Sequence, residues 1–173
     1  MANLVLTVIG DDRSGLVSAL SGVIAAHGGS WERSQMARLS GKFAGIVLVT
    51  VPDGRADELI RQLQPLRSDG LLDVTAERSH DADSPSSATR LSLELVGADR
   101  PGIVHDISRA LATRGVSIEE LRTATREAPM TGGMLFEARA TLLAPSGVPI
   151  GDLREVLEQL ANELMVDIEL TTD

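Results

Sequence analysis

The sequence predicts an α+β protein that contains two copies of one small domain. Two observations support this: a glycine-bounded turn occurs twice, and a strand–helix–strand–strand–helix–strand pattern surrounds each copy of it. The turn runs from Gly10 to Gly15 in the first copy and from Gly97 to Gly102 in the second. In both copies an apolar run precedes the turn and apolar positions at helical spacing follow it, so each turn joins a strand to a helix.

The first half of the chain shows the complete pattern once. Residues 3–9 are almost continuously apolar, which predicts a strand that is mostly covered. The expected elements are a strand at 3–9, a helix from Leu16 that stops at Gly28, strands at 30–39 and 43–51, a helix capped by Asp57, and a strand at 71–77.

The pattern then restarts after a stretch without large apolar residues. Residues 91–95 alternate leucine with polar residues, which predicts a strand that is buried on only one face. The expected elements are a strand at 91–95, a helix from Ile103 that ends at Gly115, strands at 117–126 and 134–143, a helix with its apolar face at 153–164, and a strand at 166–170. We therefore predict domains at residues 1–78 and 90–173, joined by a linker at 79–89.

Internal duplication accounts for the repeat. With an offset of 87 residues, twelve positions between residues 4 and 32 are identical in the two halves. Two successive βαββαβ units predict tandem ferredoxin-like domains, each an antiparallel four-stranded sheet with two helices on one face. Such small sheets leave edges open, so we expect the two domains to dock side by side.

Composition excludes several classes of function. The 25 acidic and 16 basic residues give a net charge of −9, which argues against direct nucleic-acid binding. There is no cysteine, and the three histidines, His27, His80 and His105, have no spacing typical of a metal site. No nucleophile or dinucleotide motif occurs, so we expect neither an enzyme nor a cofactor. The N-terminus does not resemble a signal peptide and no apolar run could span a bilayer, so we expect a cytoplasmic protein without membrane contact.

The repeated turn is the candidate binding site. A helix N-terminus presents unpaired N–H groups and partial positive charge, which suits a carboxylate or phosphate. Asp12 and Asp99 allow two interpretations. Their carboxylates could meet the ammonium group of an amino acid, or each could cap the helix that follows.

The segments from Gly10 to Val17 and from Gly97 to Val104, each followed by a helix that stops at a glycine, resemble the opening of an ACT domain. Two copies with a linker resemble the tandem-ACT proteins related to the glycine cleavage system transcriptional repressor. The resemblance implies that an amino acid binds between this turn of one domain and the start of the second strand of another. By position, the implied ligand-binding residues are Asp12, Arg13, Ser14, Gly15, Leu16, Ser30, Asp99, Arg100, Pro101, Gly102, Ile103 and Ser117.

The resemblance also implies a function. We expect a non-enzymatic amino-acid sensor that acts through a regulatory partner protein, in the transcriptional control of amino-acid or glycine metabolism, and that forms a homo-oligomer, a dimer. Amino-acid-binding members often have asparagine where Ser30 and Ser117 stand in this chain. The alternative is therefore a ligand-free ACT module for protein interaction or oligomerisation.

Overall fold

The structure is a computed structural model that describes residues 1–79, 87–130 and 132–172. The chain forms two compact units, each with its own sheet and helices. The first unit contains β1 (Ala2–Asp11), α1 (Leu16–Ala26), β2 (Ser30–Leu39), β3 (Lys42–Val51), a 3-10 turn η1 (Asp53–Arg55), α2 (Ala56–Ser68) and β4 (Asp73–Arg78). The second contains β5 (Thr89–Ala98), α3 (Ile103–Ala112), β6 (Ser117–Glu127), β7 (Met134–Ala144), α4 (Ile150–Leu164) and β8 (Val166–Thr172).

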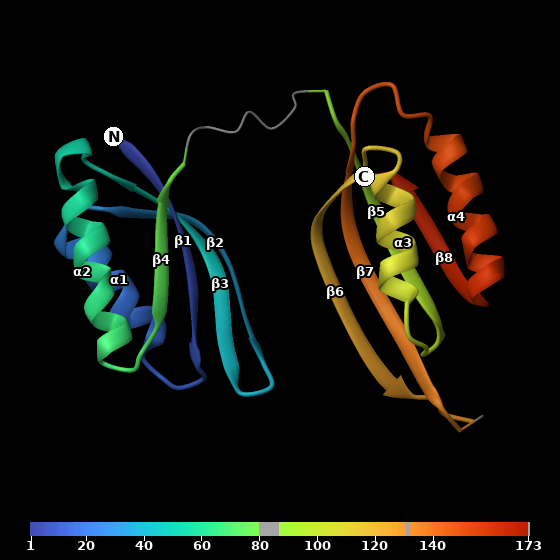
Figure 1. Ribbon diagram of the computed structural model, residues 1–173, viewed down its shortest axis with the longest axis horizontal. Helices are drawn as coiled ribbons and strands as arrows, with labels where there is room; N and C mark the ends of the chain where they lie inside the picture. The colour runs from blue at the N-terminus through green and yellow to red at the C-terminus, as the bar shows by residue number, and fades with distance from the viewer. Residues whose placement is uncertain (80–86, 131, 173) are drawn as a thin grey trace. The chain divides into compact units, whose positions relative to one another are not determined.

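Each unit is a four-stranded antiparallel sheet with its two helices on one face (Figure 1). The strand order is β2-β3-β1-β4 in the first unit and β6-β7-β5-β8 in the second. This is the predicted ferredoxin-like α+β fold, present twice. In both sheets the strand that leads into the repeated turn is central, and the second strand of the unit lies at an edge.

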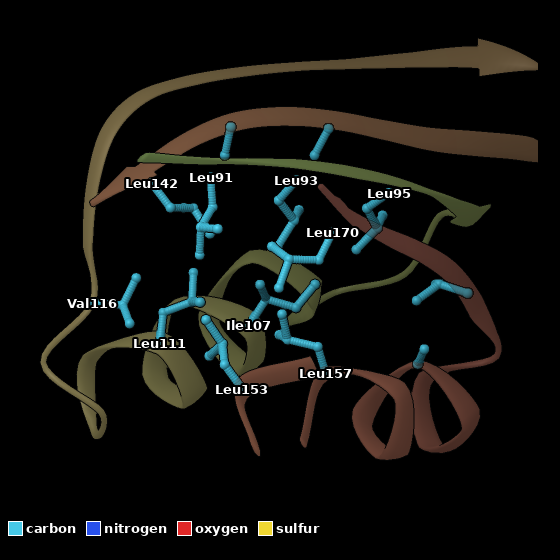
Figure 2. Close-up of a cluster of buried hydrophobic side chains, with 14 of the residues drawn as sticks. Leu91, Leu93, Leu95, Ile107, Leu111, Val116, Leu142, Leu153, Leu157 and Leu170 are labelled. Atoms are coloured by element: carbon cyan, nitrogen blue, oxygen red, sulfur yellow. The ribbon is translucent and has the colours of Figure 1, made fainter. Parts of the chain in front are cut away.

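A separate leucine-rich core lies between the sheet and the helices of each unit. Alternate residues of the central strands point toward the helices, as Figure 2 shows for Leu91, Leu93 and Leu95 of β5. They meet leucines such as Leu111 and Leu157 from α3 and α4. Full burial of one such side chain contributes about 1.5–3 kcal/mol, so each unit is stabilised chiefly by its own core.

The opposite face of each sheet, which we call the open face, carries no helix of its own unit (Figure 1). In β1 the core-facing residues Leu4, Leu6 and Val8 are buried, whereas Ile9 on the open face is 49% exposed. The first strand was predicted to be mostly covered. Within the unit, only its core-facing side is covered, and the side on the open face is exposed.

Each second strand contains a bulge. The register with β3 shifts between Trp31 and Arg33, and the register of β6 with β7 shifts between Ile118 and Glu120. The shift places Trp31 and Met36 on the same face, where both pack against the first core. This irregularity explains why the sequence of β2 does not alternate cleanly.

Several details differ from the sequence-based expectations. Asp57 is not the cap of α2, because the cap position is Arg55, without a side-chain cap bond, and Asp57 lies in the first helical turn. Thr89, expected in the linker, belongs to β5. Most of the expected linker, with His80, lies at residues 80–86, outside the described residues, as does Thr131 in the loop between β6 and β7.

Candidate functional site

The repeated turn ends in a left-handed glycine that immediately precedes a helix. Gly15 has φ 91° before α1 and Gly102 has φ 97° before α3, and neither helix start has a side-chain cap hydrogen bond. The capping interpretation of Asp12 and Asp99 is therefore wrong: glycine occupies the N-cap position in both units, and the aspartates stand three residues earlier.

The first turn borders a hollow of about 230 Å³. A side chain at Gly15 would meet no atom within 4 Å, so the backbone beside the start of α1 is open to a ligand. The volume lies below the range of about 300–1,000 Å³ typical of sites for drug-sized ligands, and it suits a small molecule. The hollow is lined by Asp12, Arg13, Gly15, Leu16, Val17, Ser18 and Phe43.

Charges of both signs surround this hollow. The Asp12 carboxylate accepts a hydrogen bond from Nη1 of Arg38 at 3.3 Å, and the Asp12 side chain is 31% exposed. Arg38 comes from the end of β2, directly opposite Phe43. Beside it, a hydrogen bond from Lys42 lowers the pKa of Asp11 below its ordinary value. The first turn thus offers an anchored carboxylate next to the positive end of a helix.

The second turn has different surroundings. Arg100 is half-buried and lines an open groove of about 500 Å³ between α3 and α4, together with Asp106, Arg109 and Glu163. Ile103 is buried and lines a cavity of about 30 Å³ under α3, whose other lining residues are apolar except Ser108. Ser14 and Pro101 are exposed in their respective turns. The two turns share a backbone shape and four identical residues. The first turn lies beside the hollow at Asp12, whereas residues of the second turn line the groove between α3 and α4 and the cavity under α3.

The second-strand serines lie far from the turn of their own unit. Ser30 is opposite Thr50 of β3, which is opposite Asn3 of β1, whereas the turn follows Asp11 at the other end of β1. Eight residues of strand separate these levels, about 26 Å. In the second unit, Ser117 lies opposite Leu143 of β7, and Leu143 lies opposite Arg90 at the start of β5, whereas the turn follows the other end of β5. A single unit therefore does not bring the turn and the serine together.

Sequence reasoning missed two contributors to the first turn, Arg38 and Phe43. The signal for Phe43 was present, since antiparallel pairing of adjacent strands places the start of β3 beside the end of β1. Arg38 carries no comparable signal, because its position on the helix side of the sheet depends on the bulge earlier in β2.

Comparison with known families gives a direct match. Residues 2–76 and 89–171 each match the sequence profile of the ACT domain. The chain belongs to the ACT-domain family. Together the two ACT domains account for nearly all of the chain, in agreement with the duplicated fold.

Several known proteins match the chain across both of its ACT domains. The chain is 24% identical over 162 residues to the glycine cleavage system transcriptional repressor of Escherichia coli, which covers 93% of this chain and 85% of that protein. It is 30% identical over 175 residues to the phosphoserine phosphatase SerB2 of Mycobacterium tuberculosis, covering 96% of this chain but only 40% of the phosphatase. Among solved structures, an unknown protein from Galdieria sulphuraria matches with a TM-score of 0.87 and 28% identity over 99% of this chain and 98% of its own.

Among residues 1–79, 87–130 and 132–172, no three His, Asp or Glu side chains come together in a way that could hold a metal ion. In the same part of the chain, none of the helices has both the length and the apolar character needed to cross a membrane.

Proposed function

We propose that this tandem ACT protein is a regulatory amino-acid sensor, and that its first turn binds a small amino acid. The observation that carries the proposal is the hollow of about 230 Å³ between Asp12 and the open N-terminus of α1. The N–H groups at the start of α1 suit the ligand carboxylate, and the Asp12 carboxylate suits its ammonium group. Phe43 and Leu16 line the apolar part of the hollow, which leaves room for only a small side chain.

The proposed site is completed by a paired ACT domain. Because Ser30 and Ser117 lie about 26 Å from the turn of their own unit, each would serve the turn of a partner domain. A serine hydroxyl can donate one hydrogen bond and accept others, so it can bind either pole of the amino acid. Arg13 and Ser14, and Asp99, Arg100, Pro101, Gly102 and Ile103 of the second turn, remain part of the proposed ligand-binding set.

The proposed output is a change in binding to a partner protein. A ligand shifts an equilibrium only through its different affinity for two states, so amino-acid binding must change the affinity for that partner. The net charge of −9 favours a protein partner over nucleic acid. The name of the Escherichia coli relative supports a role in transcriptional regulation of amino-acid or glycine metabolism, without catalysis, in the cytoplasm.

Calorimetric titration of the full chain with each of the amino acids tests the proposal. Titration at two temperatures is needed, because a binding enthalpy can pass through zero at one of them. We expect saturable heat from one or a few small amino acids and at least tenfold weaker binding by the Asp12→Ala variant. Asp11→Asn is the matched control, since Asp11 neighbours Asp12 but does not line the hollow. Absence of binding heat at both temperatures from folded protein would refute the sensor function.

A second function, that of a ligand-free interaction module, is favoured by the contact between Arg38 and Asp12. Because the guanidinium already contacts the Asp12 carboxylate, the turn is electrostatically satisfied without a ligand. This function predicts that a partner protein co-purifies with the chain to the same extent with and without added amino acids. A partner whose recovery changes with one amino acid would instead support the sensor.

A further inference from the structure

The two ACT units differ most in the chemistry of their open faces. In the first unit, the open-face positions at the centre of β1 are Val5, Thr7 and Ile9, because the residues between them point into the core. The facing positions of β3 are Ala44, Ile46 and Leu48. Thus the middle of this face has no charged side chain on either central strand, and Ile46 is 54% exposed.

The second unit has charged residues at the equivalent positions. Glu94 and Arg139 form a cross-strand pair at the place that Thr7 and Ile46 occupy in the first unit, and they make an ion pair at 3.4 Å. A second ion pair on this face joins Arg126 to Glu137 at 2.6 Å. The ACT fold therefore does not require an apolar open face, so the exposed isoleucines of the first unit need another explanation. Large exposed apolar patches usually mark interaction sites.

One row across the first sheet indicates the occupant of this face. Arg33 of β2 is level with Leu48 of β3 and Val5 of β1, and Glu77 of β4 ends the row. The row is basic at one edge, apolar in the centre and acidic at the other edge. A two-fold axis parallel to the strands, lying between two such faces, places β2 of one copy opposite β4 of the other at the same level. Arg33 of each copy then faces the partner copy's Glu77.

We propose that the open face of the first unit is a two-fold interface with the same face of a second copy of this chain. The sheets would stack about 10 Å apart with Ile46 and Thr7 at the centre, Ile9 toward one end and the Arg33–Glu77 pairs at the rim. The proposal is independent of the amino-acid site, because the hollow beside Asp12 lies on the helix side of the sheet.

The size of the face agrees with a dimer of this kind. Four strands spaced about 4.8 Å apart and about eight residues long cover roughly 500 Å² in projection. Two such faces bury roughly 1,000 Å², which is the lower limit for a specific interface. The Glu94–Arg139 ion pair at the centre of the second unit's open face would lose water if a second copy covered it. The first unit's own open-face ion pair, Lys42–Asp11, lies at the end of β1 and β3, so the centre of its face is the better interface.

Sedimentation equilibrium of the full chain tests the interface. We expect a dimer, and at least a hundredfold weaker dimerisation for the double variant Thr7→Glu/Ile46→Arg, which introduces the pair found in the second unit. That pair is compatible with the fold, as Glu94 and Arg139 show, and an unchanged far-UV circular dichroism spectrum verifies folding. Gln62→Arg is the matched control, because it places an arginine beside Glu58 on the exposed side of α2. A monomeric wild type, or a dimer that resists the double variant, would overturn the proposal.

A charge exchange tests the orientation of the axis. Arg33→Glu alone and Glu77→Arg alone should each weaken dimerisation about tenfold, because each brings like charges together at the rim. The double variant Arg33→Glu/Glu77→Arg should restore it. Within one copy these residues lie three strands apart, about 14 Å, so a restoring effect requires contact between copies. Failure of the double variant to recover would rule out an axis parallel to the strands.

Discussion

Arg38 contacts Asp12 at 3.3 Å, and the residue equivalent to Arg38 in the second unit is Thr125. Register establishes the equivalence, because Arg38 lies opposite Phe43 and Thr125 lies opposite Phe136. The nearest arginine of β6, Arg126, is one residue further along and pairs with Glu137 on the open face instead. Two turns with the same glycines and aspartate therefore have different electrostatic surroundings.

The first prediction concerns Asp12 and uses two variants. Asn is as good a helix cap as Asp, whereas Ala is not. If Asp12 capped α1, the Ala variant would therefore be about 1 kcal/mol less stable to unfolding than the Asn variant. Because Gly15 is the N-cap, we expect Asp12→Asn and Asp12→Ala to lower the free energy of unfolding equally, by less than about 1 kcal/mol, through loss of an exposed ion pair. Urea unfolding measures both. A clear advantage of Asn over Ala would restore the capping role.

The second prediction separates two glycines of similar exposure. Neither Gly15 nor Gly22 would place a new methyl group within 4 Å of another atom. Gly15→Ala should nevertheless cost about 1–3 kcal/mol, because alanine is strained at φ 91°. Gly22→Ala, within α1, should raise stability by about 0.8–1 kcal/mol through helix propensity. Opposite signs in thermal unfolding are expected, and a tolerated alanine at position 15 would contradict the left-handed turn.

The third prediction uses the only tryptophan of the chain to separate the two cores. Trp31 packs against the first core, so its fluorescence reports unfolding of the first unit. Leu63 and Leu157 are almost completely buried, one in each core. Either leucine-to-alanine change should cost about 2–5 kcal/mol. Leu63→Ala should shift the fluorescence transition, whereas Leu157→Ala should leave it in place while shifting part of the circular dichroism transition. A fluorescence transition that moves with Leu157→Ala would show that the cores unfold together.

The fourth prediction concerns the pH dependence of one ion pair. A hydrogen bond from Arg78 at 2.8 Å lowers the pKa of Asp57 below its ordinary value. Because the folded-state pKa is depressed, the contribution of this pair to stability is present above the unfolded-state pKa and is lost as pH falls through the folded-state pKa. NMR titration should show that Arg78→Gln raises the Asp57 pKa toward its ordinary value. Arg67→Gln, which removes a partner of Asp73, should leave it unchanged.

Much of the fold could be predicted from the sequence because burial is periodic. The alternation at Leu91, Leu93 and Leu95 and the helical spacing that follows Leu16 both reflect one covered face, and the structure confirms both elements. The duplication allowed each half to support the interpretation of the other. The predicted ends of helices and strands differ from the observed ends by only a few residues. At these ends backbone hydrogen bonding, and not side-chain burial, decides where an element stops.

The candidate site was less predictable, because it depends on contacts between residues distant in sequence. No local pattern pairs Arg38 with Asp12, since their contact requires the register of β2 on β3 and of β3 on β1. The capping alternative for Asp12 fails for a local reason. Gly15 directly precedes the apolar helix and glycine is itself an acceptable N-cap, so that residue, and not Asp12, marked the start of α1.

The bulge in β2 and in β6 constrains the number of residues in the strand more than the residue type at the bulge. Glu32 is the extra residue in β2, and Glu119 is its counterpart in β6. Before Glu32 the core-facing residue is odd-numbered, as at Trp31, and after it the core-facing residues are even-numbered, as at Met36. Replacing Glu32 would preserve this change of phase, whereas deleting it would turn one segment of the strand over. At this point in the chain, the number of residues determines side-chain orientation more strictly than their type does.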